Sequence, residues 1–241
     1  MSSRYAVYFA PDRHSPWRTF GAHWLGRDEH DSGVLPQPLV EGISPGELER
    51  ITQKPRRYGF HATLKAPFRL AAGYDETSLL SRLGALALKL KPVALSPLKV
   101  TTLGDLGGSS AFVALTPHAT CEHSPVDLLA LAAACVTETD DLRAPLTQQE
   151  LARRRSTPLN ARQIELLNLY GYPHVLEKFR LHMTLTGPVE ASVAQQVMRA
   201  VAPKIAQLNA DTPLWLDRLC LFVERKPGAP FHRIIDLKLT A

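Results

Sequence analysis

The sequence lacks the features that define several large classes of protein. No apolar run approaches the roughly 18 residues that cross a membrane, and the apolar stretch near the N-terminus is too short for a signal peptide and lacks its cleavage pattern. Cysteine is scarce, with 3 residues in 241, and the spacing of Cys121, Cys135 and Cys220 indicates neither a disulfide framework nor a zinc site. We therefore expect a soluble cytoplasmic protein whose cysteines are buried and inert.

A strong excess of either charge is also missing. The net charge of +5 comes from 28 Lys and Arg against 23 Asp and Glu, which is too mild to indicate a nucleic-acid-binding protein. The local distribution says more, because residues 51–74 hold five basic residues and no acid, and residues 178–189 hold Lys178 and Arg180 and no acid. Such segments favour the binding of an anion, although clustering on a solvated surface gives the same pattern.

Hydrophobic residues are present in sufficient number, at 45% of the chain, to form a substantial core. Their periodicity predicts strands and helices in alternation. Expected strands cover 4–10, 57–70, 95–103, 111–116, 180–187, 214–223 and 231–239, with a Gly-rich turn at 104–110; expected helices cover 16–26, a short segment from 45, 75–90, 126–136, 147–155, 159–170 and 192–209.

The order strand, helix, strand, strand occurs twice, once from His61 and again from His182. An internal repeat of this length predicts two similar lobes that face each other. We expect an α+β protein with two pseudo-symmetric, mostly antiparallel sheets, helices on the outer faces and a central groove. Residues 1–241 would form one domain, with repeat units at about 57–117 and 178–241.

One short motif stands at equivalent places in the two repeats. It reads His61-Ala62-Thr63-Leu64 in the first and His182-Met183-Thr184-Leu185 in the second. With 9 His, 16 Thr and 37 Leu in the chain, chance alone gives about 0.09 His-x-Thr-Leu matches. Two matches in corresponding positions therefore point to a shared role.

Alternation along a strand places the polar residues of each motif on one face. In the first strand this face would carry Arg57, His61, Thr63 and Lys65, and the opposite face would be apolar. The second strand shows the same division, with Lys178, Arg180, His182, Thr184 and Thr186 on the polar face. The apolar faces would form the core, and the polar faces would meet across the groove.

Two imidazoles across a groove suit general acid–base catalysis, because one can be neutral while the other is protonated near neutral pH. We expect His61 and His182 to act as base and acid, in an order that the sequence leaves open. Thr63 and Thr184 would donate to an oxyanion, while Lys65 and Arg180 would hold a phosphate. Tyr58 is a further candidate for substrate contact. The natural substrate of this set is a phosphodiester.

Other interpretations compete with this one. The histidines could be core residues, or could bind a metal, although two His without a carboxylate make a poor zinc or magnesium site. We expect no metal and no cofactor. A binding module that holds a phosphorylated metabolite or an RNA end, and a ligase-like reaction, also remain open. We interpret residues 153–155 as a solvated helix end that could reach the rim of the groove. Tyr5 and Tyr8 could reach the groove from the first strand, although packing is the favoured interpretation.

The two His-x-Thr motifs in duplicated lobes resemble the 2H phosphoesterase superfamily, whose fold is called LigT-like. Longer blocks resemble its phosphonate-metabolism-associated branch, and they cover nearly the whole chain. These blocks are 5–11, 24–27, 57–68, 143–145, 150–155, 171–173 and 179–187.

The resemblance implies a bilobal fold with a central groove, and metal-independent cyclic phosphodiesterase chemistry with one His as base and the other as acid. His61, Thr63, His182 and Thr184 match the family motif without departure. The branch also implies a small phosphorylated sugar or cyclic phosphate ester as substrate. We expect neither a membrane nor an obligate protein partner.

Overall fold

The computed structural model describes residues 3–31, 33–95, 97–104, 111–118 and 126–241. The helices are α1 (Pro16–Leu25), α2 (Pro45–Arg56), α3 (Glu76–Ala87), α4 (Val126–Thr137), α5 (Gln148–Arg154), α6 (Ala161–Tyr170) and α7 (Ala191–Asp211), with short 3₁₀ turns η1 (Asp140–Leu142) and η2 (Leu176–Lys178). The strands are β1 (Arg4–Phe9), β2 (Ala62–Phe68), β3 (Val93–Ala94), β4 (Leu98–Leu103), β5 (Phe112–Pro117), β6 (Met183–Thr184), β7 (Trp215–Leu216), β8 (Arg218–Glu224) and β9 (His232–Lys238).

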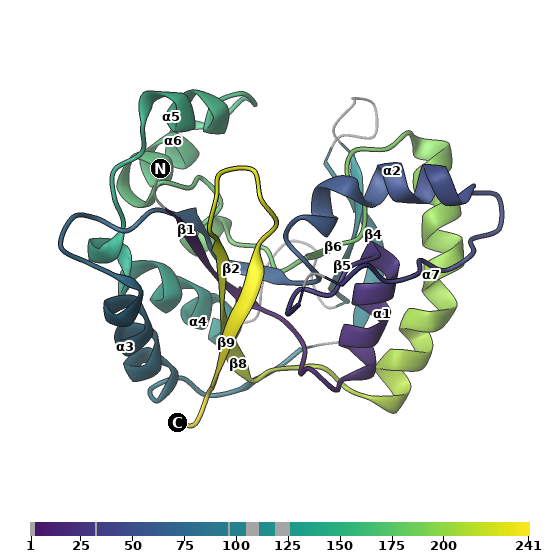
Figure 1. Ribbon diagram of the computed structural model, residues 1–241, viewed down its shortest axis with the longest axis horizontal. Helices are drawn as coiled ribbons and strands as arrows, with labels where there is room; N and C mark the ends of the chain where they lie inside the picture. The colour runs from purple at the N-terminus through teal and green to yellow at the C-terminus, as the bar shows by residue number, and fades with distance from the viewer. Residues whose placement is uncertain (1–2, 32, 96, 105–110, 119–125) are drawn as a thin grey trace.

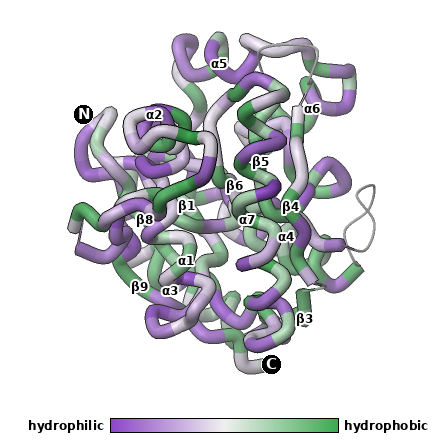
Figure 2. Tube along the Cα trace, turned by 90° about the vertical axis from the view of Figure 1, so that its right-hand side faces the viewer, coloured by the Kyte–Doolittle hydropathy of each residue, from purple (hydrophilic) through white to green (hydrophobic). Residues whose placement is uncertain are grey.

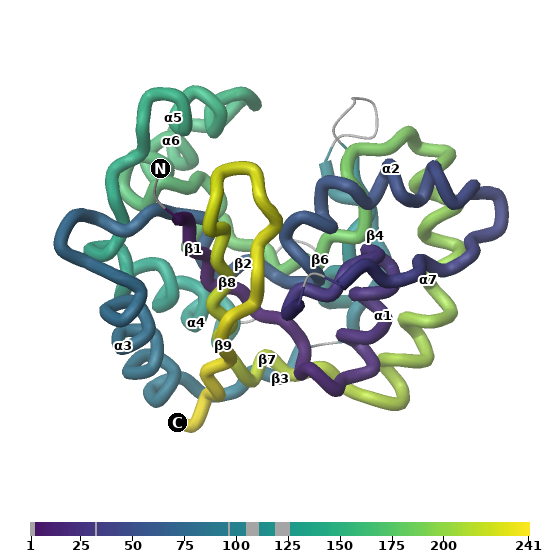
Figure 3. Tube along the Cα trace, in the orientation of Figure 1, coloured from purple at the N-terminus to yellow at the C-terminus, as the bar shows by residue number. Residues whose placement is uncertain are grey.

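The main sheet runs in the order β4-β5-β6-β2-β1-β8-β9. Every pairing described within it is antiparallel. A second, two-stranded antiparallel sheet pairs β3 with β7, and both strands lie at the end of the molecule opposite α5 (Figure 3). The expected α+β class with antiparallel sheets is confirmed.

The chain divides into two halves that flank the centre of the main sheet (Figure 1). One half carries β2, β1, β8 and β9 with α3, α4, α5 and α6; the other carries β4, β5 and β6 with α1, α2 and α7. The β2–β6 pairing joins the halves, so the two sets of strands form one continuous ladder. The order strand, helix, strand, strand, strand occurs from β2 to β5 and again from β6 to β9.

Local sequence signals set the ends of the helices. Ser15 and Ser44 accept hydrogen bonds at the N-caps of α1 and α2, each followed by Pro at the first helical position. Gly26 ends α1 in the left-handed conformation. The hydropathy tube shows hydrophobic segments at the centre around β5 and β6, with hydrophilic segments over α5 (Figure 2). Helix α1 therefore begins and ends within one residue of the predicted 16–26, and α2 begins at the predicted residue 45.

The strands that carry the motifs are shorter than the sequence predicts. Helix α2 continues to Arg56, a turn follows, and β2 begins only at Ala62. Strand β6 holds Met183 and Thr184 alone. Most of the expected Gly-rich turn lies at 105–110, outside the described residues. None of the helices among the described residues is long and apolar enough to cross a membrane.

Candidate active site

The two His-x-Thr motifs meet where β2 pairs with β6. Ala62 lies opposite Met183 in this antiparallel pair, and both side chains are fully buried in the core. Because neighbouring side chains on a strand point to opposite faces, the residues on either side project away from that core. When this antiparallel register is continued by one residue on each side of the Ala62–Met183 pair, His61 lies across from Thr184 and Thr63 lies across from His182. Directly opposite residues have Cβ atoms about 4.5–5.5 Å apart, so the four side chains form one cluster.

The two imidazoles are held by matching backbone hydrogen bonds. Nδ1 of His61 lies 2.9 Å from the carbonyl oxygen of Gly59, and Nδ1 of His182 lies 2.9 Å from that of Arg180. A carbonyl oxygen only accepts, so Nδ1 carries the proton in both rings. Nε2 is then the free, basic nitrogen of each neutral ring. The hydroxyl of Thr63 lies 3.3 Å from Nε2 of His61.

Gly59 has a backbone conformation that other residues rarely adopt, with φ at +80°. A Cβ at this position would lie 2.9 Å from the Cβ of Glu29, which is closer than carbon atoms normally approach. The left-handed turn orients the Gly59 carbonyl toward His61. Glycine at 59 is therefore part of what fixes the tautomer of the catalytic candidate.

Burial keeps both histidines neutral at neutral pH. Burial, with a smaller contribution from the nearby His182, lowers the pKa of His61 to about 4, although the hydrogen bond to the Gly59 carbonyl opposes this shift. Burial also lowers the pKa of His182. The ring of Tyr8, itself 1% exposed, stacks on His61 with centroids 3.8 Å apart. His61 is thus a base that stays unprotonated well below pH 7.

A groove of about 740 Å³ opens above this cluster. His182 lies against the groove residue Phe112, with ring centroids 6.0 Å apart. His182 is also close enough to the groove residues His61 and His174 that its protonated form contributes to their lowered pKa values. The groove is lined by Arg4, Tyr8, Lys54, Pro55, Arg57, Tyr58, His61, Thr63, Ala66, Pro67, Phe112, Arg153, Arg154, Thr157, Tyr172, Pro173, His174, Thr184, Thr186, Gly187 and Pro188.

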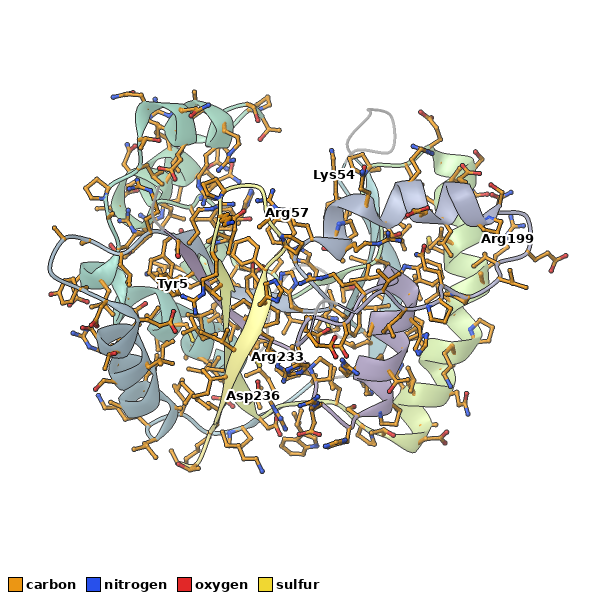
Figure 4. The ribbon with its side chains drawn as sticks, viewed as in Figure 1. Tyr5, Lys54, Arg57, Arg199, Arg233 and Asp236 are labelled. Atoms are coloured by element: carbon orange, nitrogen blue, oxygen red, sulfur yellow. The ribbon has the colours of Figure 1, made fainter. Side chains whose placement is uncertain are left out.

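Positive charge dominates the groove. No Asp or Glu is among the described residues that line it, whereas five cationic residues are: Arg4, Lys54, Arg57, Arg153 and Arg154. Figure 4 labels Lys54 and Arg57, which lie on the upper side of the molecule between its two halves. The expected anion-binding surface thus has a physical counterpart, and it faces the histidines.

The structure brings most of the candidate residues together. His61, Thr63, Thr184 and Tyr58 line the groove, and His182 lies directly beside it against Phe112. Lys65 and Arg180 do not line it.

Lys65 points away from the groove, contrary to the prediction. It is 3% exposed, and its Nζ donates to the Val136 carbonyl at 3.0 Å and to Asp140 at 3.3 Å. The cause is a bulge in β2: Tyr8 pairs with Thr63, but Val7 pairs with Lys65, so one residue is inserted between them. Such an insertion switches the face to which the following side chains point, and Lys65 shares the core face of Val7.

Arg180 also departs from its predicted place. Its side chain is exposed, because the strand begins only at Met183 and the regular alternation does not extend back to residue 180. Its backbone carbonyl accepts the hydrogen bond of His182.

Arg153 and Arg154 line the groove, so the helix end reaches the groove, which is the alternative that the sequence left open. Tyr8 packs in the core, as expected, and it also lines the groove and stacks on His61. Two other groove residues escaped the sequence-based prediction. Arg4 and Tyr172 carry no local signal, because only tertiary contacts bring β1 and the segment after α6 to the groove.

Other chemistry-bearing groups lie apart from the groove. Cys135 and Cys220 are buried, and burial raises the pKa of each thiol to about 12, as expected of inert cysteines. Cys121 lies outside the described residues. In the part of the chain that the structure describes, no three His, Cys, Asp or Glu side chains form a group that could hold a metal ion.

The fold and the groove define an α+β protein with a basic cleft around two histidines. A family model matches residues 63–232, and the chain belongs to that family, which is described as "Protein of unknown function (DUF1045)".

Two curated relatives carry the name "Ribose 1,5-bisphosphate phosphokinase PhnN". The one from Janthinobacterium sp. (strain Marseille) is 42% identical over 233 residues, which are 95% of this chain and 49% of the relative. The one from Laribacter hongkongensis (strain HLHK9) is 35% identical over 232 residues, 95% of this chain and 50% of the relative. The chain therefore spans about half the length of the curated relatives it matches.

Among solved structures, Usb1 of Kluyveromyces marxianus aligns with 98% of this chain and 97% of its own chain. The sequence identity is 13% and the TM-score is 0.35.

Proposed function

We propose that this protein is a phosphodiesterase that hydrolyses a small or cyclic phosphoester by general acid–base catalysis, as the resemblance to the 2H phosphoesterases implies. The observation that carries the proposal is the pairing of Ala62 with Met183, which places the two His-x-Thr motifs side by side in antiparallel order. The two unprotonated Nε2 atoms would serve one basic groove, which His61 lines and His182 adjoins through Phe112. Two titrating groups around one anion site are what the cleavage of a phosphodiester needs.

His61 suits the role of base, because its pKa of about 4 keeps Nε2 unprotonated. It accepts a proton from water while the water oxygen forms a bond to phosphorus. The bond from phosphorus to the ester oxygen breaks, and that oxygen takes the proton from Nε2 of His182. The bound phosphate raises the pKa of His182 by its negative charge, so that this ring enters the reaction protonated.

The hydroxyls of Thr63 and Thr184 donate to the non-bridging phosphate oxygens, where charge accumulates in the transition state. The groove cations neutralise the remaining charge, and Tyr58 contacts the substrate from the wall. No metal or cofactor takes part in this scheme.

The PhnN-named relatives and the resemblance to the phosphonate-associated branch support a role linked to phosphonate metabolism. We therefore favour a cyclic or phosphorylated sugar over RNA. A module that only binds an RNA end or a phosphorylated metabolite would not need two imidazoles with lowered pKa values. A ligase-like reaction would run the same proton transfers in reverse.

A screen of small cyclic phosphates tests the proposal. Purified protein is incubated with 2′,3′-cyclic nucleotides and with cyclic ribose phosphates, with and without EDTA, and products are followed by phosphorus NMR. We expect ring opening to a monoester in both conditions. Binding without turnover across the whole panel would favour the binding module. With an alcohol added, ring opening to an acyclic diester in place of a monoester would favour the ligase-like reaction.

A further inference from the structure

Five groove residues outside the two motifs form an arginine–tyrosine cluster: Arg4, Tyr8, Tyr58, Arg154 and Tyr172. All five line the groove, and they come from β1, from the turn after α2, from α5 and from the segment after α6. The guanidinium of Arg154 lies over the ring of Tyr172, 4.9 Å from its centroid. Elements distant in the sequence thus converge on one place.

The charged and phenolic ends of these side chains also converge. The pKa of Tyr8 is raised, first by burial and then by the neighbouring Tyr58 and Tyr172 hydroxyls, while Arg4 opposes the rise. Burial lowers the pKa of Arg154, and Arg4 lowers it further. These electrostatic effects agree with the geometry, because all five residues line the same groove and Arg154 lies over the ring of Tyr172.

Arg154 has an unmade hydrogen bond. Its Nη2 donates to the Pro67 carbonyl at 3.2 Å, but its Nε is buried without a partner among the described residues. A buried guanidinium N–H that is left unpaired costs free energy. A ligand anion that reaches this nitrogen would recover that cost.

Arg4 is held in place but not fully neutralised. It pairs with Glu224, and so does Arg57; that carboxylate is 1% exposed. One carboxylate therefore balances two guanidiniums, and the cluster keeps net positive charge once Arg154 is included. The net positive charge of the cluster complements the charge of a phosphate dianion, and its phenolic hydroxyls can donate to the phosphate oxygens.

The cluster adjoins the histidine pair but is distinct from it. The ring of Tyr8 stacks on His61, while its hydroxyl end belongs to the cluster with Arg4. Tyr8 therefore links the histidine pair to the arginine–tyrosine cluster within one groove.

We propose that the arginine–tyrosine cluster binds a second, terminal phosphate monoester of the same substrate, which makes the preferred substrate a small phosphodiester with an additional phosphate group. This inference rests on the proposed phosphodiesterase function for its catalytic part. The binding of a phosphate monoester at the cluster stands on the contacts above.

Two substrates that differ only in a terminal phosphate test the proposal. We would compare kcat/KM for 2′,3′-cyclic AMP with and without a 5′-phosphate. Wild-type protein should prefer the 5′-phosphorylated compound by about 10–100-fold, the scale of hydrogen bonds to a charged group. Arg154→Met should remove most of this preference. The control Arg155→Met alters the next residue, which is exposed and bonds Asn168, and should keep the wild-type ratio.

A binding measurement separates this proposal from the catalytic one. Ribose 5-phosphate binding is measured by calorimetry in a His61→Ala, His182→Ala background. Adding Arg154→Met or Tyr172→Phe should weaken binding about 10-fold or more, and adding Arg155→Met should not. This result would support the cluster even if no diester were cleaved. The proposal would be overturned if Arg154→Met, Tyr172→Phe and Arg155→Met all left the affinity for ribose 5-phosphate unchanged. It would also be overturned if the wild-type enzyme cleaved diesters without preferring the 5′-phosphate.

Discussion

At the scale of single residues, the site depends on how each imidazole is held. In both His61 and His182, Nδ1–H donates a hydrogen bond to the carbonyl two residues earlier. Nε2 is therefore the nitrogen available to substrate. The hydroxyl of Thr63 lies beside one of these nitrogens, and Gly59 supplies the carbonyl that orients His61. Tautomer and orientation are therefore set by a few local contacts, whereas burial sets the lowered pKa values.

Thr63→Ala and Thr184→Ala should each lower kcat/KM by about 10–100-fold, because each removes one hydroxyl that donates to the phosphate. The loss should be smaller than for either histidine. Steady-state kinetics on a substrate from the screen would measure it, with thermal unfolding as a control for folding. Unchanged kinetics in both variants would remove the threonines from the site.

Gly59→Ala should lower both stability and activity. The new methyl group would meet Glu29 and the backbone would be strained at positive φ, at a cost of about 1–3 kcal/mol in the free energy of unfolding. Gly73→Ala is a matched control, since Gly73 also has positive φ, at +89°, but open space around it. We expect kcat/KM to fall only in Gly59→Ala; an equal effect in both would show that strain alone matters.

At the scale of elements, the strand β2 shows how far sequence patterns reach. The N-caps of α1 and α2, the presence of strands at β1 and β8 and the position of both motifs could be predicted, because they depend on neighbouring residues. The bulge between Thr63 and Lys65 could not, because it is defined by the register against β1. Arg4 and Tyr172 were missed for the same reason: only the tertiary fold brings them to the groove.

Lys65→Met tests the structural role of the lysine that the bulge turns inward. Burial lowers the pKa of Lys65 to about 8, although Asp140 opposes this. Removing the ammonium leaves the Val136 carbonyl unpaired, so we expect the free energy of unfolding to fall by about 1–3 kcal/mol.

The matched variant Lys54→Met should behave in the opposite way, because Lys54 is exposed and lines the groove. Its stability should stay near wild type while KM rises. Denaturant unfolding and kinetics on both variants would show this. A rise in KM for Lys65→Met at unchanged stability would contradict the structural role.

At the scale of the whole molecule, the groove lies where the two halves of the chain join. The β2–β6 pairing links them, and each half contributes one His-x-Thr motif. Neither half could assemble the pair alone. Basic residues of α5 and of the end of α2 line the groove from the two halves of the molecule. Substrate binding, charge neutralisation and proton transfer therefore depend on the complete fold.

The pH dependence of kcat/KM should be bell-shaped with an acidic optimum. Activity rises with pH as His61 loses its proton near pH 4. It falls again as His182 loses its proton, at a pKa that burial lowers from 6.5. The optimum of kcat/KM, which reports the free enzyme, should therefore lie between about pH 4 and 6.5. The value of kcat should stay high to a higher pH, because bound phosphate favours protonated His182. A kcat/KM optimum above pH 7.5 would disagree with both pKa shifts.

The most direct test of the central claim, that the two histidines act as one acid–base unit without a metal, is a double-mutant cycle in EDTA. We would measure kcat/KM for wild type, His61→Ala, His182→Ala and the double variant. Each single variant should lose about 10²–10⁴-fold, and the double variant should lose little more than the worse single variant, since groups that act together are strongly non-additive. Multiplicative losses, near-wild-type activity in either single variant, or wild-type activity that EDTA abolishes and a divalent metal restores would contradict the claim.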